Sequence, residues 1–321
     1  METTRRNFLG TVGVAASAAA VANAAKTLTP ASGPRLYVAA VTPCDNKGKF
    51  DDGVYRDMMT FFKDHGLDGV LVLGTTGEFA SFSVAERKKV AETALKHRNG
   101  LEIMVQVGTP NLPETLDLLA HAQANGADQV LCIPPFYFKN PSTEGLTKYY
   151  SQVLEATRLP VNLYHYPGMS AVPITAQLLH NLEHYPNLAG IKDSTGDAKA
   201  YAELLKEFPK LNLMTGTEGN LTNALAAGKG GILVSANLFP RQAQACFDAA
   251  RKGGDVAAAY AKLREVNALS RLPGAGASAV IKYGFTVYGM RESFVRPPQL
   301  DLTAAQKAAF APNLAKIKAL G

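Results

Sequence analysis

Eight short apolar runs recur along the chain, and they restrict its possible folds more than any other feature of the sequence. Successive runs begin 20 to 33 residues apart, and most are rich in Val, Ile or Leu. Strands that are buried on both faces have this nearly continuous apolar character, so the runs predict eight parallel strands. They cover residues 36–41, 69–73, 102–107, 129–133, 161–165, 188–192, 211–215 and 231–235.

The segments between these runs have the period of amphipathic helices. Residues 84–97 and 113–125 are two examples, because their apolar residues recur every three to four positions. Ser83 and Glu86 have the spacing of a capping box, which predicts a helix start. A strand followed by a helix, repeated eight times, is typical of a (β/α)8 TIM barrel, and we expect this α/β fold over residues 34–254. A doubly wound sheet is the alternative, although such sheets rarely contain eight units of this even spacing.

The region after the eighth unit, residues 255–321, predicts about three further helices. The two best defined cover 255–270 and 303–320. Pro312 interrupts the second of them, so we expect that helix to be kinked or split there. No linker rich in Pro, Gly or Ser separates this region from the barrel, which indicates a helical appendage packed against it.

Residues 1–24 contain, in order, the features of a twin-arginine signal peptide. Thr-Arg-Arg-Asn-Phe-Leu at 4–9 precedes an Ala-rich apolar run at 12–22, and Ala-Asn-Ala at 22–24 offers a cleavage site. The alternative is an Ala-rich surface helix, and the run is too short and too rich in Ala to indicate a membrane span. We therefore expect export of the folded protein to the periplasm, without stable membrane association once the signal is removed.

Charge and cysteine content narrow the function. The 321 residues carry a formal charge of +6 without any block of five or six Lys or Arg, so nucleic acid is not an expected partner. Cys44, Cys132 and Cys246 are too few and too scattered for a disulfide scaffold or a zinc site. His180 and His184 have the spacing of a helical metal pair, but a solvated helix face is the favoured interpretation. We expect neither a metal nor another cofactor.

Groups that can bind an anion follow the second predicted strand. Barrel enzymes place their chemistry at this end of the strands, where the loops to the helices begin. Gly-Thr-Thr-Gly-Glu-Phe at 74–79 offers the hydroxyls of Thr75 and Thr76 beside backbone N–H groups. Such a loop suits a small carboxylate or phosphate oxygen.

Lys192 ends the sixth predicted strand, and two interpretations of it are open. In a partly desolvated barrel mouth an amine is more easily kept neutral, and a neutral amine can attack a ketone to form a Schiff base. Alternatively, its stem lies along the rim and its ammonium group pairs with Asp193. Asp193 is expected on the other face of the strand, which slightly weakens this alternative.

Tyr137 and Tyr164 carry hydroxyls at the same end of the predicted barrel. They could relay protons to and from a substrate, or each could pack and find one hydrogen-bond partner. The presence of Lys192 and the Thr-Thr loop at this end favours the relay. His165 is either a contact to a second substrate or a packed core histidine.

Together these motifs resemble the dihydrodipicolinate synthase / N-acetylneuraminate lyase family of pyruvate-handling class I aldolases. The resemblance covers essentially the whole chain after the signal, residues 34–318. It implies a barrel with three C-terminal helices, assembled as a dimer or tetramer, and a small-molecule 2-oxo acid as substrate. The matching motifs are Gly-Thr-Thr-Gly-Glu at 74–78, Tyr137, Tyr164 with Pro167, and Gly-Ile-Lys at 190–192.

The resemblance also implies roles for individual residues. Lys192 resembles the Schiff-base lysine of the family, and Tyr164 resembles the proton carrier beside it. Thr75 and Thr76 resemble the ligands of the substrate carboxylate, with Thr75 also in the proton relay. Tyr137 resembles the tyrosine that crosses the dimer interface into the neighbouring active site. The remaining residues that the resemblance places around the substrate are His165, Gly216, Glu218 and Ile232.

Two departures from the family bear on the substrate. Dihydrodipicolinate synthases carry an Arg two residues after the motif proline, where it holds the carboxylate of aspartate semialdehyde, and this chain has Met169 there. It also has His165 where those enzymes have Asn, as some members similar to sialate lyases do. Together with the expected export, the missing Arg favours an aldolase or dehydratase of pyruvate or a 2-oxo-3-deoxy sugar acid. The alternatives are 4-hydroxy-tetrahydrodipicolinate synthase and, less favoured, an exported carboxylate-binding protein without turnover.

Overall fold

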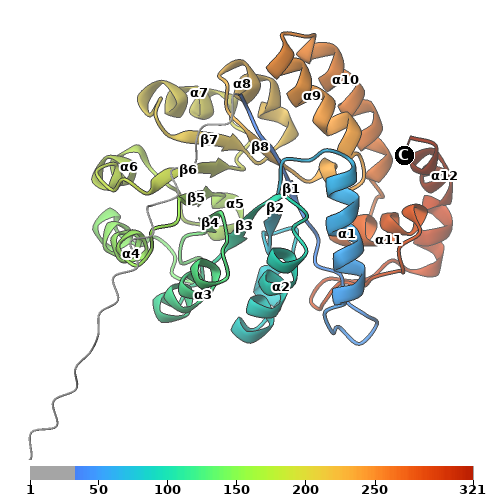
Figure 1. Cartoon of the computed structure of the whole chain (residues 1–321), viewed down its shortest axis with the longest axis horizontal. Coiled ribbons are helices and arrows are strands. Elements are labelled where there is room, and N and C mark those ends of the chain that lie inside the picture. Colours follow the sequence, from blue (N-terminus) through green and yellow to red (C-terminus); the bar gives the residue numbers. More distant parts are fainter. Residues whose placement is uncertain (1–32, 321) are drawn as a thin grey trace, which may run out of the picture.

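The structure is a computed structural model that describes residues 33–320. Eight parallel strands close into a barrel in which each strand pairs with the next along the chain and the last pairs with the first (Figure 1). This closed order confirms the α/β fold class, a (β/α)8 barrel. The strands are β1 (Leu36–Ala39), β2 (Gly69–Val72), β3 (Glu102–Gln106), β4 (Gln129–Cys132), β5 (Val161–His165), β6 (Leu188–Asp193), β7 (Asn212–Thr215) and β8 (Gly231–Leu233).

Several strands end one or two residues before the end of the apolar run that predicted them. β2 shows a physical reason, because Leu73 has a φ of +60°, a left-handed conformation that no strand can continue through. β5 and β7 end where their runs end, and β6 runs one residue further, to Asp193. Loops such as the one after β2 therefore begin earlier than hydrophobicity alone predicts.

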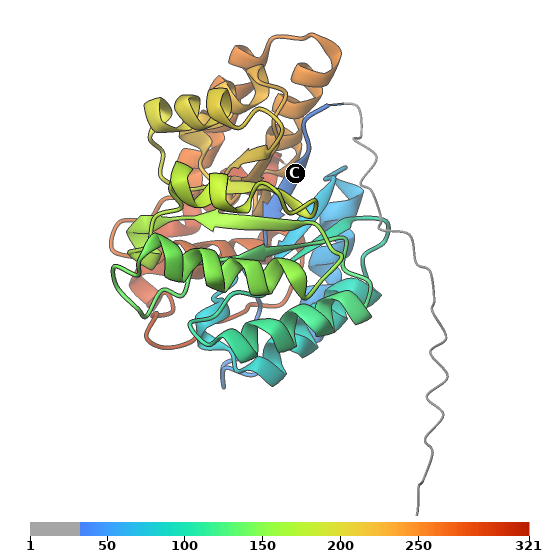
Figure 2. The same cartoon turned by 90° about the vertical axis from the view of Figure 1, so that its left-hand side faces the viewer.

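Helices α1 to α9 surround the strands (Figures 1 and 2). The predicted capping box is present at the start of α2: the Ser83 hydroxyl accepts from the Glu86 N–H, and the Glu86 carboxylate accepts from the Ser83 N–H. The helices are α1 (Asp52–Asp64), α2 (Val84–Lys96), α3 (Leu112–Ala124), α4 (Thr143–Glu155), α5 (Pro167–Ser170), α6 (Ala176–Leu182), α7 (Ala198–Glu207), α8 (Leu221–Ala226) and α9 (Pro240–Lys252).

Three helices follow the barrel: α10 (Val256–Asn267), α11 (Ala277–Gly284) and α12 (Ala304–Leu320). They lie on one side of the barrel, near α9 and α1 (Figure 1). Phe285, directly after α11, packs against Phe61 and Phe62 of α1, with ring centroids 5.8 and 6.2 Å apart, so the appendage and the barrel share an apolar core. α12 is continuous through Pro312. The expectation of a split there is wrong, because buried side chains on both sides of the proline hold one helix against its neighbours.

Hydrogen-bonded polar side chains line the barrel interior at the amino ends of the strands. The Tyr37 hydroxyl donates to Glu102 and accepts from Gln129 Nε2 at 2.6 Å. Asn162 Nδ2 in turn donates to Gln129 Oε1 at 2.8 Å. Gly69 is required here, since a Cβ atom would lie 2.4 Å from the Tyr37 ring. These groups bond largely to one another, which leaves the carboxyl ends of the strands as the place for reactive groups.

The expected signal peptide, residues 1–24, lies outside the described residues. The export that it predicts is therefore still a prediction. Across residues 33–320, no helix is long and apolar enough to cross a membrane.

Candidate active site

Lys192 extends from β6 into the barrel and not along its rim. It is 4% exposed, and its Nζ atom lies 3.4 Å from the Tyr164 hydroxyl and 4.4 Å from the centroid of that ring. The two residues are register partners in adjacent parallel strands, so both side chains point to the same face of the sheet. The alternative pairing with Asp193 is wrong, because that carboxylate accepts from the N–H and hydroxyl of Thr195, at 3.2 and 2.8 Å.

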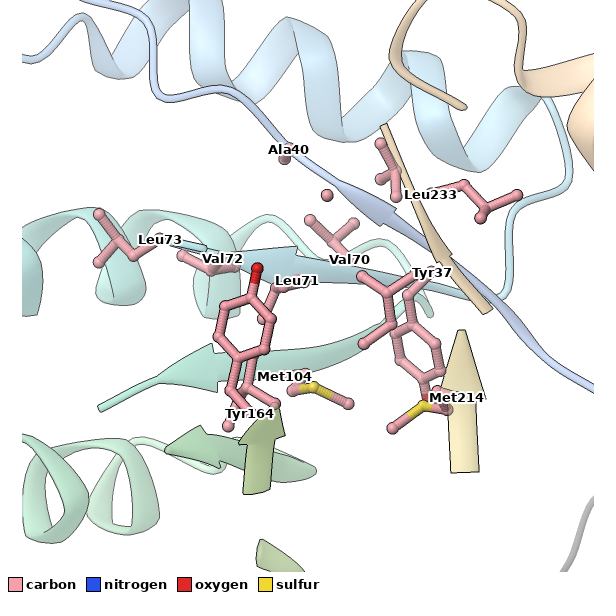
Figure 3. Packing of buried hydrophobic residues seen from close by; sticks show 14 of the residues in the cluster. Tyr37, Ala40, Val70, Leu71, Val72, Leu73, Met104, Tyr164, Met214 and Leu233 are labelled. Carbon is pink, nitrogen blue, oxygen red and sulfur yellow. The ribbon is translucent and has the colours of Figure 1, made fainter. Parts of the chain in front are cut away.

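Tyr164 connects Lys192 to the loop after β2. Its hydroxyl lies 3.2 Å from the hydroxyl of Thr75, so the amine, the phenol and the threonine form a continuous line of hydrogen-bonding groups. The Tyr164 ring is buried among apolar side chains that include Leu71 and Met104 (Figure 3). Such a line can pass a proton from one group to the next at a reacting carbon.

The loop after β2 presents Thr75 and Thr76, both partly exposed, at the barrel mouth. Its backbone is held at two points. Gly77 O accepts from the Thr42 hydroxyl at 2.8 Å, and Thr76 O accepts from the Ser278 hydroxyl at 3.2 Å. Thr42 and Ser278 were not identified from the sequence, because nothing in the local pattern around either residue indicates a contact with this loop.

Tyr137 lies on the surface of the single chain. It is 75% exposed, and the neighbouring Phe138, which packs edge to face against it at 5.7 Å between centroids, is 56% exposed. Within residues 33–320, no hydrogen bond joins Tyr137 to Lys192, Tyr164 or Thr75. Its role in the site of a neighbouring subunit is still a prediction.

His165 is on the outer face of the barrel, because it follows Tyr164 in the same strand. Its Nδ1 accepts from the Ile174 N–H at 2.9 Å, and its Nε2 lies 3.8 Å from Asp193 Oδ2. Burial lowers the pKa of His165 and raises the pKa of the Asp193 carboxyl. The bond to Ile174 anchors the segment after β5, which includes α5 and the 57% exposed Met169.

Gly216, Glu218 and Ile232 belong to the region of β7 and β8. At Gly216 a Cβ atom would lie 2.9 Å from Lys192 Cε, so the glycine leaves room for the lysine stem. Glu218 Oε1 accepts from the Ser235 N–H at 3.1 Å, and Glu218 lines a cavity of about 410 Å³ between the barrel and the appendage. Ile232 is wholly buried within β8. Their contact with a substrate is still a prediction.

The two histidines considered as a metal pair do not share a helix. α6 ends at Leu182, before His184. His180 contacts Glu207 and Glu183 at the surface, at 2.8 and 3.3 Å, and its hydrogen bonds to these two carboxylates raise the pKa of its ring. Among the residues that the structure describes, no group of three or more His, Cys, Asp or Glu could hold a metal ion.

The comparisons with known proteins agree on one family. The profile of the Dihydrodipicolinate synthetase family matches residues 33–317. An uncharacterised DapA-like lyase from Chloroflexus aurantiacus is 38% identical over 74% of this chain and 81% of its own. A 4-hydroxy-tetrahydrodipicolinate synthase from Thermodesulfovibrio yellowstonii is 34% identical over 67% of this chain and 75% of its own. The crystal structure of YagE from E. coli K12, a prophage protein in complex with pyruvate, has a TM-score of 0.82 at 27% identity, covering 89% of this chain and 98% of its own.

Proposed function

The chain belongs to the dihydrodipicolinate synthetase family, whose members are pyruvate-dependent class I aldolases and lyases, and from this premise we propose that Lys192 forms a Schiff base with pyruvate or a 2-oxo-3-deoxy sugar acid. The observation that carries the proposal is the buried line from the Lys192 amine through Tyr164 to Thr75. The binding of pyruvate by the related YagE supports the same substrate class.

In the proposed reaction, the Lys192 amine attacks the ketone carbon and water is lost to give an iminium ion. The iminium accepts the electron pair of the bond that breaks at the neighbouring carbon, so an enamine forms and no free carbanion does. Protons must be supplied and removed at each of these steps. The 3.4 Å contact with the amine supports Tyr164 as their carrier, and the 3.2 Å contact with Thr75 supports a relay behind it.

The carboxylate of the substrate has a proposed site at the loop after β2. The hydroxyls of Thr75 and Thr76, with nearby backbone N–H groups, bind its two oxygens. Holding the carboxylate turns the ketone carbon toward Lys192, and such orientation removes much of the entropic barrier to attack. Gly216 supports this arrangement, because a Cβ atom there would crowd the lysine stem and the Ser194 hydroxyl.

4-Hydroxy-tetrahydrodipicolinate synthase is the second candidate, because relatives with that name match most of the chain. That reaction needs a cation for the carboxylate of aspartate semialdehyde. Met169, exposed on α5, offers none at the corresponding position. For this reason we place the sugar-acid activity first.

We also propose export and assembly for this enzyme. The twin-arginine pattern at 4–9 supports delivery of the folded protein to the periplasm. The exposed pair Tyr137 and Phe138 supports a dimer or tetramer in which this surface is covered.

Reductive trapping tests the chemistry. The protein is incubated with pyruvate and borohydride, weighed, and digested for peptide mapping. We expect one covalent adduct per chain, on Lys192, and none in Lys192→Ala. An unlabelled wild-type protein would favour the non-catalytic binding protein, and an adduct on another lysine would contradict the assignment of Lys192.

A further inference from the structure

The backbone of the loop after β2 is strained at both of its ends. Leu73 has a φ of +60° and Glu78 has a φ of +56°, so a left-handed, non-glycine residue stands on each side of Thr75 and Thr76. Such residues keep this conformation only where the surrounding structure enforces it, and they are concentrated at functional sites. The contacts that enforce it here identify further residues on which the loop depends.

A buried ion pair holds Glu78, and its cation comes from the appendage. Glu78 Oε1 lies 2.5 Å from Lys282 Nζ of α11, and the side chains of both residues are wholly buried. Glu78 Oε2 accepts from the Arg296 N–H at 3.0 Å, and Lys282 Nζ donates to Phe294 O at 2.7 Å. Each charge therefore has a charged partner and a backbone partner.

α11 holds the loop at a second point. Ser278, one helical turn before Lys282 on the same face of the helix, donates to Thr76 O at 3.2 Å. One helix of the appendage therefore contacts the loop both at its strained end, through Glu78, and at one of the two threonines.

From these contacts we infer that Lys282 and Ser278 are positioning residues for the carboxylate of the substrate. They act through Glu78 and Thr76 and do not touch the substrate. Buried ion pairs contribute little net stability, but removing one partner leaves an uncompensated charge that the structure must relieve. Loss of Lys282 should therefore let Glu78 leave its left-handed conformation, and Thr75 and Thr76 would move with it. The inference rests on the proposed Schiff-base function.

The test is Lys282→Met, which keeps most of the length of the side chain and removes its charge. Borohydride trapping is measured against pyruvate concentration, together with the melting temperature. We expect the half-saturating pyruvate concentration to rise by about tenfold to a hundredfold, the usual range for a misplaced binding group, while saturating pyruvate still labels Lys192. Lys88→Met is the matched control. Lys88 pairs with Asp117 at 2.7 Å between α2 and α3, and its loss should leave half-saturation unchanged.

Two further variants separate positioning from stability. Ser278→Ala removes only the hydrogen bond to Thr76 O. It should raise the half-saturating pyruvate concentration by about threefold to tenfold, as the loss of one hydrogen bond predicts. This variant tests the inference even if Lys282→Met fails to fold. The double variant Glu78→Gln with Lys282→Met has no uncompensated charge, so its melting temperature should recover. Half-saturation should stay raised, because no ion pair then ties residue 78 to α11. Normal half-saturation in Ser278→Ala, or its recovery along with stability in the double variant, would overturn the inference. Absence of any label in the wild type would overturn the proposed function itself.

Discussion

At the scale of single residues, the proposed chemistry divides between an amine that forms a bond and a hydroxyl that moves protons. Lys192 and Tyr164 are register partners, with 3.4 Å between the amine nitrogen and the phenol oxygen. Neither group can replace the other. Replacing Tyr164 by Phe keeps the ring among its apolar neighbours and removes only the hydroxyl. We expect turnover to fall by about 10²–10⁴, the usual contribution of an acid–base group, while borohydride still traps some imine on Lys192.

Tyr201→Phe is the control for this variant. Tyr201 is equally buried, but its hydroxyl donates to Leu213 O in β7, so its loss should lower stability by about 1 kcal/mol without reducing turnover. Equal losses of turnover in the two variants would mean that Tyr164 only packs.

The substrate preference depends on Met169. In the proposed site this exposed side chain offers no charge to a second carboxylate, so we expect poor turnover of aspartate semialdehyde with pyruvate. Met169→Arg should raise kcat/KM for that aldehyde by about tenfold, since a hydrogen bond between charged groups contributes about 1.5–3 kcal/mol. Turnover of aspartate semialdehyde by the native enzyme at an ordinary metabolic rate would favour the synthase instead.

At the scale of elements, periodic sequence patterns predict the helices and strands. The apolar runs gave all eight strands within two residues at each end, and Ser83 with Glu86 gave the start of α2. Lys192 and Tyr164 could be identified because both lie at the carboxyl ends of predicted strands and both match motifs of the family. The early end of β2 at Leu73 and the contacts of Lys282 could not, because a left-handed φ and a partner about 200 residues away leave no local pattern.

The segment after β5 should respond to pH through His165. Its Nδ1 accepts from the Ile174 N–H, which a protonated ring cannot do. Burial lowers the pKa of His165, so its contribution to folding is complete above its unfolded value near 6.5 and is lost as pH falls below it. We expect the free energy of unfolding to fall by up to about 1.4 kcal/mol per pH unit from this group. His165→Asn offers an acceptor that does not titrate and should flatten the profile in urea melts.

Two other groups titrate near this range with the opposite sign. Burial raises the pKa of the Asp193 carboxyl above its ordinary value of 3.8. Its contribution to stability is therefore complete below pH 3.8 and is lost as pH rises above that value, opposite in sign to that of His165. His180 at the surface has a raised pKa, and its contribution is present below pH 6.5 and lost as pH rises. His180→Asn should therefore change the slope in the opposite direction to His165→Asn. Identical profiles for the two variants would contradict the role of His165.

At the scale of the whole molecule, export should depend on the paired arginines at 5 and 6. Arg5→Lys with Arg6→Lys keeps the charge and removes the twin-arginine pattern. We expect the protein to stay in the cytoplasm, folded and soluble, because the substitutions lie outside the barrel. Fractionation of cells by compartment measures this, and unchanged periplasmic delivery would contradict the export proposal.

Catalysis should depend on assembly through Tyr137, which is 75% exposed in the single chain. If each subunit lends this hydroxyl to a neighbour, Tyr137→Phe and Lys192→Ala are each nearly inactive alone but complement one another when co-expressed. In a hybrid dimer the Tyr137→Phe subunit keeps its lysine and receives an intact tyrosine from its neighbour. Random pairing should restore about a quarter of the wild-type activity, because half of the dimers are hybrids and each has one complete site. If Tyr137 instead acts within its own subunit, no site in the mixture has both groups and no activity returns.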